Sequence, residues 1–126
     1  MRRLATSGSP YEDRYAFSRA VRVGDRIEVA GTAPVPRPGQ PVAPTAYEQM
    51  LRCGEIALAA LADLGGSAGD VIRTRMFITD PDDADAVGRA HRELFEAARP
   101  AATMAVVRLI DPTWKVELEV EAVVAE

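Results

Sequence analysis

Three glutamates alternate with apolar residues near the end of the chain: Glu117, Glu119 and Glu121. Side chains of a β-strand alternate between its two faces at about 3.4 Å per residue, so this spacing predicts a row of carboxylates roughly 7 Å apart. A carboxylate in a partly dry cleft has a raised pKa and can act as a general acid or base, which contributes about 10²–10⁴ in rate. Such a row needs partners, and a hydrolytic site or facing arginines would supply them.

Two other residues could carry chemistry, His91 and Cys53. His91 lies on the apolar stripe of an expected helix, with no second histidine or cysteine at ligand spacing, so a packed or interface histidine is favoured over catalysis or a metal site. Cys53 lies within another expected helix and has no histidine that the sequence places beside it, which favours a buried thiol. The sequence therefore predicts no metal site.

Composition excludes several classes of function. The 126 residues suffice for a single domain, 1–126, that buries about two thirds of its unfolded surface. Fifteen basic residues against 19 acidic ones give a net charge of −4, which disfavours nucleic acid as a partner. The single cysteine excludes an internal disulfide. Because no apolar run has the length of a signal peptide or a membrane span, we expect a cytoplasmic protein with no membrane contact.

The strands that must position the glutamates begin early in the chain. Alternation predicts strands over 15–23 and 26–32, joined by a tight hairpin at Gly24 and Asp25. The following segment, 34–41, contains too many prolines for regular structure and is expected to form a loop.

Two helices are expected in the middle of the chain. Thr45 and Glu48 form a capping box, and apolar residues at helical spacing then predict a helix that ends at Gly65. The second helix is expected to begin at Asp80, followed by a proline and further acids, and to stop before Pro100.

Three further strands are expected over 71–79, 103–109 and 115–124. The element order then suits a mixed sheet with both helices packed on one face. The uncovered face would carry the glutamates together with alternate residues of the first of these strands: Val71, Arg73, Arg75 and Phe77. This face is too apolar for water and too charged for a dry core, so we expect a homo-oligomer with pockets where subunits meet.

Six segments in sequence order, spanning nearly the whole chain, resemble the signature segments of the YjgF/Rid family. They are Ser7–Glu12, Phe17–Gly24, Val29–Thr32, Asp70–Arg75, Arg99–Ala101 and Val116–Glu119.

The resemblance implies a chorismate-mutase-like α+β fold and a homotrimer whose three sheets form a central β-barrel, with clefts between subunits. It implies no cofactor. The best-known members of the family hydrolyse reactive enamines and imines, such as 2-aminoacrylate, to a keto acid and ammonia.

The resemblance also implies where the site lies. The family's Pro-Ala-Arg motif, whose arginine holds the substrate carboxylate, here reads Pro100-Ala101-Ala102, so this chain is a divergent member that lacks the substrate-binding arginine. Arg99 and Arg108 are not expected to replace it. Loss of such a clamp would weaken binding of a 2-imino acid about ten- to a hundredfold.

Glu117 matches the family glutamate that positions or activates the hydrolytic water, and it is the predicted catalytic residue. The alternative is that it pairs with an arginine across the sheet. Gly31 would present its backbone N–H to the ligand or merely let the chain turn, and Phe17 would line the pocket or lie in the core. Phe17, Ala30, Ala102 and Met104 together predict a substrate-binding pocket less polar than is usual in the family.

The sequence leaves two functions from different classes. The first is a hydrolase of a small imine, enamine or related reactive metabolite at an inter-subunit cleft, and not an efficient 2-aminoacrylate deaminase. The alternative is a non-catalytic trimer that binds a small metabolite. Ribonuclease activity, also associated with the family, is disfavoured by the acidic balance.

Overall fold

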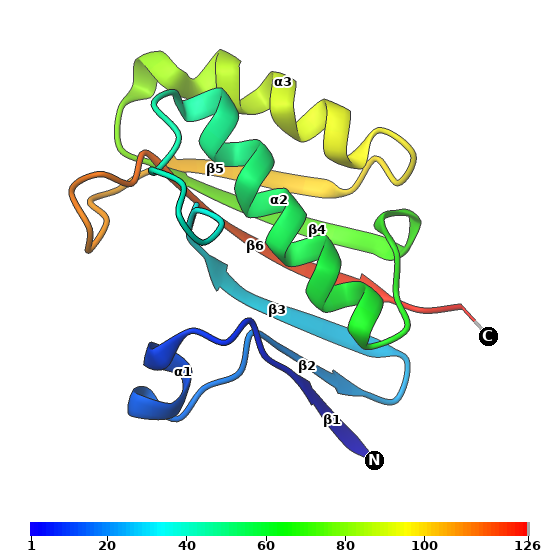
Figure 1. Ribbon diagram of the computed structural model, residues 1–126. Coiled ribbons are helices and arrows are strands. Elements are labelled where there is room, and N and C mark those ends of the chain that lie inside the picture. Colours follow the sequence, from blue (N-terminus) through cyan, green and yellow to red (C-terminus); the bar gives the residue numbers. More distant parts are fainter. Residues whose placement is uncertain (126) are drawn as a thin grey trace.

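The computed structural model describes residues 1–125, which form one six-stranded mixed sheet with the order β1-β2-β3-β6-β4-β5. Helices α2 and α3 lie side by side on one face of this sheet (Figure 1). Only β4 and β5 run parallel. The strands are β1 (Arg2–Ala5), β2 (Ala20–Val23), β3 (Arg26–Thr32), β4 (Val71–Ile78), β5 (Ala101–Val106) and β6 (Val116–Val123), and the helices are α1 (Pro10–Tyr15), α2 (Ala46–Asp63) and α3 (Ala84–Phe95). The expected α+β class is confirmed, and none of the described helices is long and apolar enough to cross a bilayer.

Helix α2 begins and ends where the sequence predicts. The Thr45 hydroxyl accepts a hydrogen bond from the backbone N–H of Glu48 at 3.2 Å, which satisfies one free donor of the first turn. At the other end, Arg22 donates to the carbonyl of Leu64 at 2.7 Å. A cation at this position also interacts favourably with the helix dipole.

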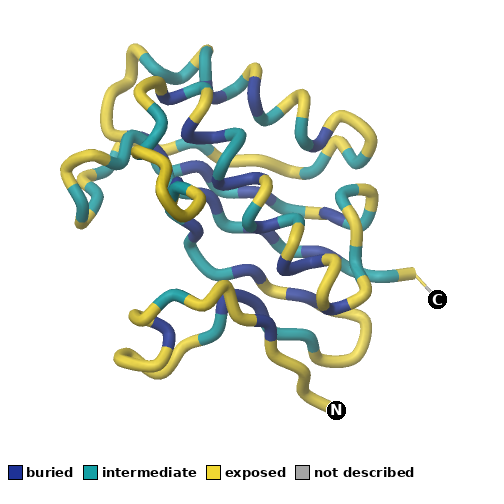
Figure 2. The backbone as a smooth tube through the Cα atoms, in the orientation of Figure 1, coloured by how far each residue is buried: buried dark blue, intermediate teal, exposed yellow. Residues whose placement is uncertain are grey.

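The hydrophobic core lies between the two helices and the sheet, where Figure 2 shows buried backbone on α2 and on the central strands. Its largest fully buried side chains include Phe95, Met50, Leu61, Leu118 and Ile27. Helices α2 and α3 approach closely at Gly54, where an added Cβ would lie 2.6 Å from Leu94 Cδ2.

The N-terminal region differs from the prediction. Residues 15–23 were expected to form one strand, but Pro10–Tyr15 form helix α1 and only Ala20–Val23 form β2. Ser9 caps α1 by accepting from the N–H of Tyr11, and Pro10 occupies the first helical position. The short strand β1, which pairs with β2, was not predicted. The Gly24-Asp25 hairpin between β2 and β3 is confirmed.

Strand β4 carries a local irregularity that reverses one expected facing. Val71 was expected on the uncovered face, but it is buried in the core and Ile72 is exposed instead. The pairing with β6 shifts register between Val71 and Arg73, and one extra residue in a strand reverses the facing on one side of it. Beyond the shift, Arg73, Arg75 and Phe77 lie on the uncovered face as expected.

Helix α3 and strand β5 also have different bounds from those predicted. Helix α3 begins at Ala84 and not at Asp80, and it ends at Phe95, whose carbonyl accepts from the N–H groups of both Ala98 and Arg99. Strand β5 spans Ala101–Val106 where 103–109 was expected, and the N–H of Val107 donates to the carbonyl of Ile78, the last residue of β4.

Candidate functional site

Glu117 lies on the uncovered face of the central strand β6. Its cross-strand neighbour on β4 is Phe77, and the side chain is half-buried. On the other side, a Cβ added to Gly31 would lie 2.8 Å from Glu117 Oε1. The absence of a side chain at Gly31 therefore leaves the space that the Glu117 carboxylate occupies.

Burial controls the protonation of Glu117. Desolvation raises the pKa of its carboxyl group above the usual value, and the charge of Glu119 on the same strand adds to this effect. The charge of Arg19 opposes it and lowers the pKa. Among residues 1–125, Glu117 has no ion pair, and Arg73 donates to Thr103 instead at 2.6 Å. The cross-sheet pairing of Glu117 with Arg73 or Arg75, which the sequence left open, is therefore not observed.

Arg19 lies beside this carboxylate and was not predicted to take part in the site. It is only 7% exposed and comes just before β2. Its Nη1 donates to the carbonyl of Gly31 at 2.6 Å and to Thr32 Oγ1 at 3.2 Å. Both acceptors lie where the pairing of β3 with β6 shifts register, so Arg19 holds the irregular part of β3 against which Glu117 rests.

Glu12 holds Arg19 from the opposite side. Its Oε2 lies 3.7 Å from Arg19 Nε, and both side chains are almost fully buried. The Glu12 carboxylate also accepts from the hydroxyls of Thr6 at 2.7 Å and Ser7 at 2.5 Å. Although desolvation raises the pKa of Glu12, the hydrogen bonds from Ser7 and Thr6 and the charge of Arg19 together lower it.

Phe17 belongs to the same cluster. The Arg19 guanidinium lies 5.5 Å from the centre of the Phe17 ring, which is cation–π distance. Phe17 is 40% exposed, so it is a surface aromatic and not a core residue. Of the predicted site residues, the structure therefore brings together Glu117, Gly31 and, through Arg19, Phe17.

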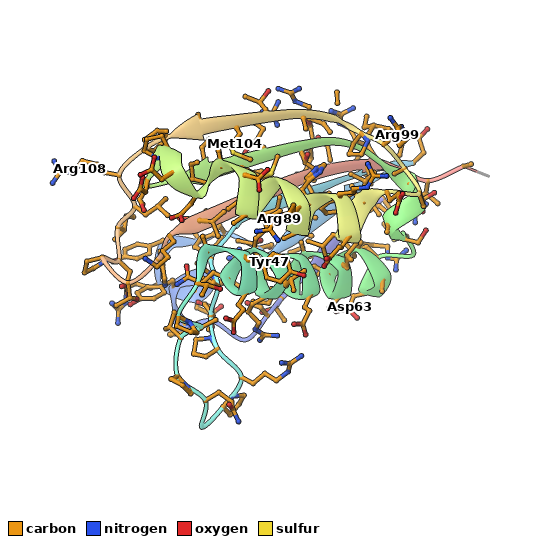
Figure 3. The ribbon with its side chains drawn as sticks, turned by 90° about the horizontal axis from the view of Figure 1, so that it is seen from above. Tyr47, Asp63, Arg89, Arg99, Met104 and Arg108 are labelled. Carbon is orange, nitrogen blue, oxygen red and sulfur yellow. The ribbon has the colours of Figure 1, made fainter. Side chains whose placement is uncertain are left out.

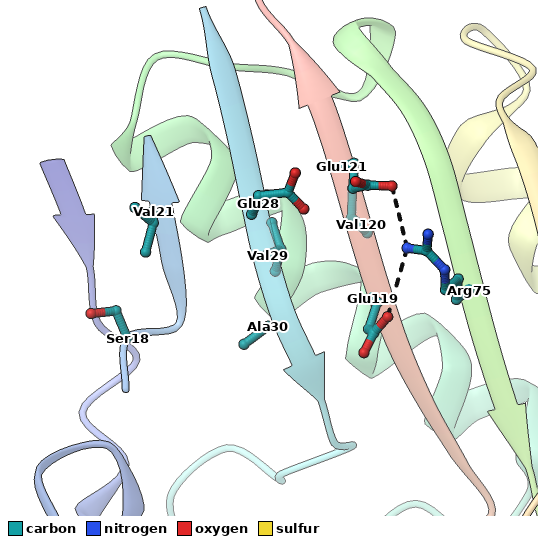
Figure 4. Close-up of a pocket in the computed structure, with 9 residues that line it drawn as sticks. All are labelled: Ser18, Val21, Glu28, Val29, Ala30, Arg75, Glu119, Val120 and Glu121. Atoms are coloured by element: carbon teal, nitrogen blue, oxygen red, sulfur yellow. Dashed lines mark hydrogen bonds and ion pairs between the residues drawn. The ribbon is translucent and has the colours of Figure 1, made fainter. Parts of the chain in front are cut away.

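The remaining glutamates of β6 are ion-paired. Arg75 Nη1 lies 3.2 Å from Glu121 Oε2 and 3.8 Å from Glu119 Oε1, and Arg26 bonds Glu121 from the other side at 2.8 Å. These pairs border an open hollow of about 300 Å³ on the uncovered face (Figure 4). The charges of this hollow pair within the chain, and of the predicted pocket residues only Ala30 lines it, so Glu117 lies outside it.

Ala102 and Met104 lie apart from Glu117 within the protomer. Their partners on β4 are Thr74 and Met76, which belong to the core face. Met104 packs against the core, and Ala102 is exposed at the sheet edge. Arg99 and Arg108 are both exposed and lie near opposite ends of β5 (Figure 3). A pocket that combines Ala102 with Glu117 would therefore need a second protomer.

The other two candidates have structural roles. His91 Nε2 lies 2.7 Å from the Thr74 hydroxyl, its ring packs on Phe95, and burial lowers its pKa. Cys53 is fully buried, and desolvation, with the nearby charge of Glu117, raises the pKa of its thiol far above the usual value. Within the described part of the chain, no group of three or more potential ligands is arranged to hold a metal ion.

Sequence reasoning missed Arg19 and Glu12 for different reasons. An acidic residue in the first turn of a helix capped by Ser9 and Pro10 was readable, and recognising α1 would have placed Glu12. Arg19 gives no comparable signal, because its partners, Gly31 and Thr32, lie in another strand.

Comparison with known proteins agrees with this fold. Residues 9–124 match the profile of the family described as endoribonuclease L-PSP. An uncharacterised Streptomyces coelicolor protein, SCO2049, is 43% identical over 95% of this chain and 90% of its own. A RutC family protein of Pyrococcus abyssi is 30% identical over 82% of each chain. The crystal structure of Rv2704 from Mycobacterium tuberculosis, described as a YjgF/YER057c/UK114 family member, superposes with a TM-score of 0.89 at 34% identity, covering 98% of this chain and 100% of that one.

The fold and the cluster around Glu117 thus define a small α+β protein with an uncovered sheet face and a half-buried carboxylate on it. The chain belongs to the endoribonuclease L-PSP family, which is the YjgF/YER057c/UK114 or Rid family.

Proposed function

We propose that this protein hydrolyses a small imine, enamine or related reactive metabolite in the cytoplasm, with Glu117 as the catalytic carboxylate in a cleft between protomers of a homotrimer. The proposal depends on one observation: the Glu117 carboxylate is half-buried with a raised pKa, and among the described residues it forms no ion pair. Perturbed carboxylates of this kind are typical of general acid–base sites.

The chemistry uses one carboxylate in two protonation states. The imine reacts with its nitrogen protonated from solvent: Glu117 removes a proton from water as the water oxygen bonds to the imine carbon, and the C=N π electrons move to nitrogen to give a neutral carbinolamine. Glu117 then returns its proton to that nitrogen, and ammonia leaves as the C=O bond forms and the proton of the carbinolamine hydroxyl is released to solvent. Water and imine are thereby converted into carbonyl compound and ammonia, and a raised pKa suits a group that must both accept and donate a proton.

The substrate is expected to be less anionic than a 2-imino acid. Position 102 carries alanine where the carboxylate-binding arginine of the family would stand, and Arg99 and Arg108 are exposed near opposite ends of β5 (Figure 3). Without that clamp, 2-aminoacrylate should bind about ten- to a hundredfold more weakly than it would bind to a site that contains the arginine.

A homotrimer is supported by two surfaces of the protomer. The uncovered face places Phe77 and the β6 glutamates beside one another, and such a mixed surface is unsuited to open solvent. Strand β5 is an edge strand without charge or proline, and most of it is exposed (Figure 2). Unprotected edges of this kind favour pairing with another chain. The net charge of −4 gives no corresponding support for an RNA substrate.

The decisive experiment measures ammonia release from imines generated in situ by an amino-acid oxidase, with 2-aminoacrylate and a series of less polar imines as substrates. Wild-type protein should accelerate hydrolysis of the less polar imines, and Glu117→Gln should lower kcat by about 10²-fold or more without changing the assembly. Unchanged turnover in Glu117→Gln would remove Glu117 from the mechanism. Saturable binding of an imine analogue without any turnover would favour the non-catalytic alternative.

A second variant tests the position of the carboxylate. Gly31→Ala adds a Cβ where Glu117 Oε1 now lies, so the carboxylate must move and kcat should fall. Gly88→Ala is the matched control, because an added Cβ there meets nothing within 4 Å. Equal activity in both variants would contradict the proposed geometry.

A further inference from the structure

The cluster behind Glu117 contains a buried cation that the hydrolytic mechanism has not used. Only 7% of the Arg19 surface is exposed, yet its Nε has no hydrogen-bond partner among the described residues. A buried donor without a partner is unfavourable, and its persistence calls for a compensating role.

The contacts of Arg19 join two regions that are far apart in the sequence. On one side, Glu12 of α1 contacts Nε at ion-pair distance, and Thr6 and Ser7 in the segment before α1 supply the hydroxyls that hold Glu12. On the other side, Nη1 bonds the carbonyl of Gly31 at 2.6 Å. Gly31 in turn contacts the Glu117 carboxylate through the space left by its missing side chain.

We propose that Arg19 is a positioning residue for Glu117: held by Glu12, it fixes the Gly31 carbonyl and so the backbone against which the Glu117 carboxylate lies. The positive charge of Arg19 also favours the ionised form of that carboxylate. This inference depends on the proposed function for its effect on turnover, but its effect on Glu117 itself can be measured without any substrate.

The charges around Glu117 make this effect assignable. From the segment before β2 the facing group is Arg19, and from β6 it is Glu119, which already pairs with Arg75. Across the sheet, on α2, Cys53 stays neutral because burial raises the pKa of its thiol. The direct neighbours on β3 and β4 are the uncharged Gly31 and Phe77, and Arg75, two residues before Phe77 on the same face, is paired with Glu119 and Glu121. Arg19 is thus the cation that lowers the Glu117 pKa against the effect of burial.

The test is a ¹³C NMR titration of the Glu117 carboxyl carbon, assigned by its loss in Glu117→Gln, in three arginine variants. Arg19→Met should move the titration of Glu117 to higher pH, because the favourable charge is gone. Arg19→Lys lacks the planar group that bonds two acceptors but keeps the positive charge. The titration of Glu117 in this variant should therefore stay closer to that in the wild type. The control is Arg22→Met. Arg22 lies on β2 and, like Arg19, donates a hydrogen bond to a backbone carbonyl, in this case that of Leu64 at the end of α2.

Turnover of the less polar imines then separates charge from geometry. Arg19→Lys should lower kcat about tenfold at all pH values, since a small displacement of the carboxylate is costly. In Arg19→Met, kcat at neutral pH should fall by at least the same factor, and the acidic limb of the pH profile of kcat should move to higher pH. Arg22→Met should retain the wild-type profile.

The outcomes distinguish the two proposals. If wild-type protein turns over no imine but Arg19→Met shifts the Glu117 titration, the hydrolase proposal fails and the coupling stands. If the titration of Glu117 is the same in Arg19→Met, Arg22→Met and wild type, the coupling is overturned whatever the activity. Should Arg19→Met fail to fold, Arg19→Lys remains as the test. Because this variant keeps the positive charge, a large shift of the Glu117 titration to higher pH in Arg19→Lys would overturn the role of charge.

Discussion

At the scale of single residues, Glu117 is where stability and the proposed chemistry oppose each other. A carboxylate on a sheet face would be more stable if it were ion-paired, as Glu121 is with Arg26 and Arg75. Glu117 is instead pressed against Gly31 with its charge partly desolvated. Destabilising groups of this kind concentrate at functional sites, where activity and stability are traded.

The raised pKa of Glu117 predicts a pH-dependent stability difference between wild type and Glu117→Gln. Well below the ordinary glutamate pKa of 4.5, the side chain is neutral in folded and unfolded wild type alike. As the pH rises above that value, the unfolded chain loses the proton first, so the free energy of unfolding of wild type falls relative to that of the variant. The difference stops growing above the raised pKa of the folded state.

We therefore expect Glu117→Gln to be more stable than wild type at pH 7.5, by a margin that shrinks at pH 4. Urea unfolding at the two pH values measures it. A margin that grows toward pH 4 would show that the Glu117 pKa is lowered by folding and not raised.

At the scale of elements, the contact at Gly54 sets the distance between helices α2 and α3. Glycine normally weakens a helix interior relative to alanine by up to about 1 kcal/mol. At Gly54 it is required because the Leu94 side chain occupies the space of the missing Cβ. The sequence showed an apolar helical stripe there, but it contained no sign of this close approach.

Gly54→Ala should consequently destabilise the protein by about 1–3 kcal/mol despite the gain in helix propensity, because Leu94 must move within a packed interface. Gly88→Ala in α3, where an added Cβ contacts nothing, should instead stabilise it by up to about 1 kcal/mol. Chemical denaturation of both variants provides the measurement, and a stabilised Gly54→Ala would contradict the tight packing.

At the scale of the whole molecule, the two faces of the sheet have different roles. One face is covered by α2 and α3 (Figure 1). The other presents the charged pairs and Val21 (Figure 4), together with Phe77 opposite Glu117. Three sheets facing inward would cover that surface and bring the edge strand β5 of one protomer near the Glu117 cluster of another. Such an arrangement would unite Ala102 with Glu117, which the single chain does not do.

Sedimentation should therefore give three times the chain mass of 13.6 kDa for wild type. Ala105→Glu places a new charge on the uncovered face of β5, opposite Phe77, and should weaken the trimer and lower activity on dilution. Ala59→Glu makes the same change on the exposed surface of α2 and should leave the mass unchanged. A wild-type monomer at micromolar concentration would contradict the shared cleft.

Local signals predicted much of this fold. Helix α2, the Gly24-Asp25 hairpin and the alternation of β6 were all readable, because caps, turn residues and period-2 patterns act within a few positions of the chain. The prediction was wrong for α1, because its Ser-Pro start was overlooked, and for Val71, because a register shift between two strands reverses a facing without any signal in the strand itself.

The sequence alone determined the α+β class, the family and the row of glutamates on one face of β6, since these depend on periodicity and on motifs contiguous along the chain. Only the tertiary structure decided that Glu121 is neutralised while Glu117 is not, and that Gly31, Arg19 and Glu12 surround it. Those contacts join β6 to β3 and to the segment around α1, and pairing between segments so far apart is set by the register of the sheet, which a local pattern does not encode.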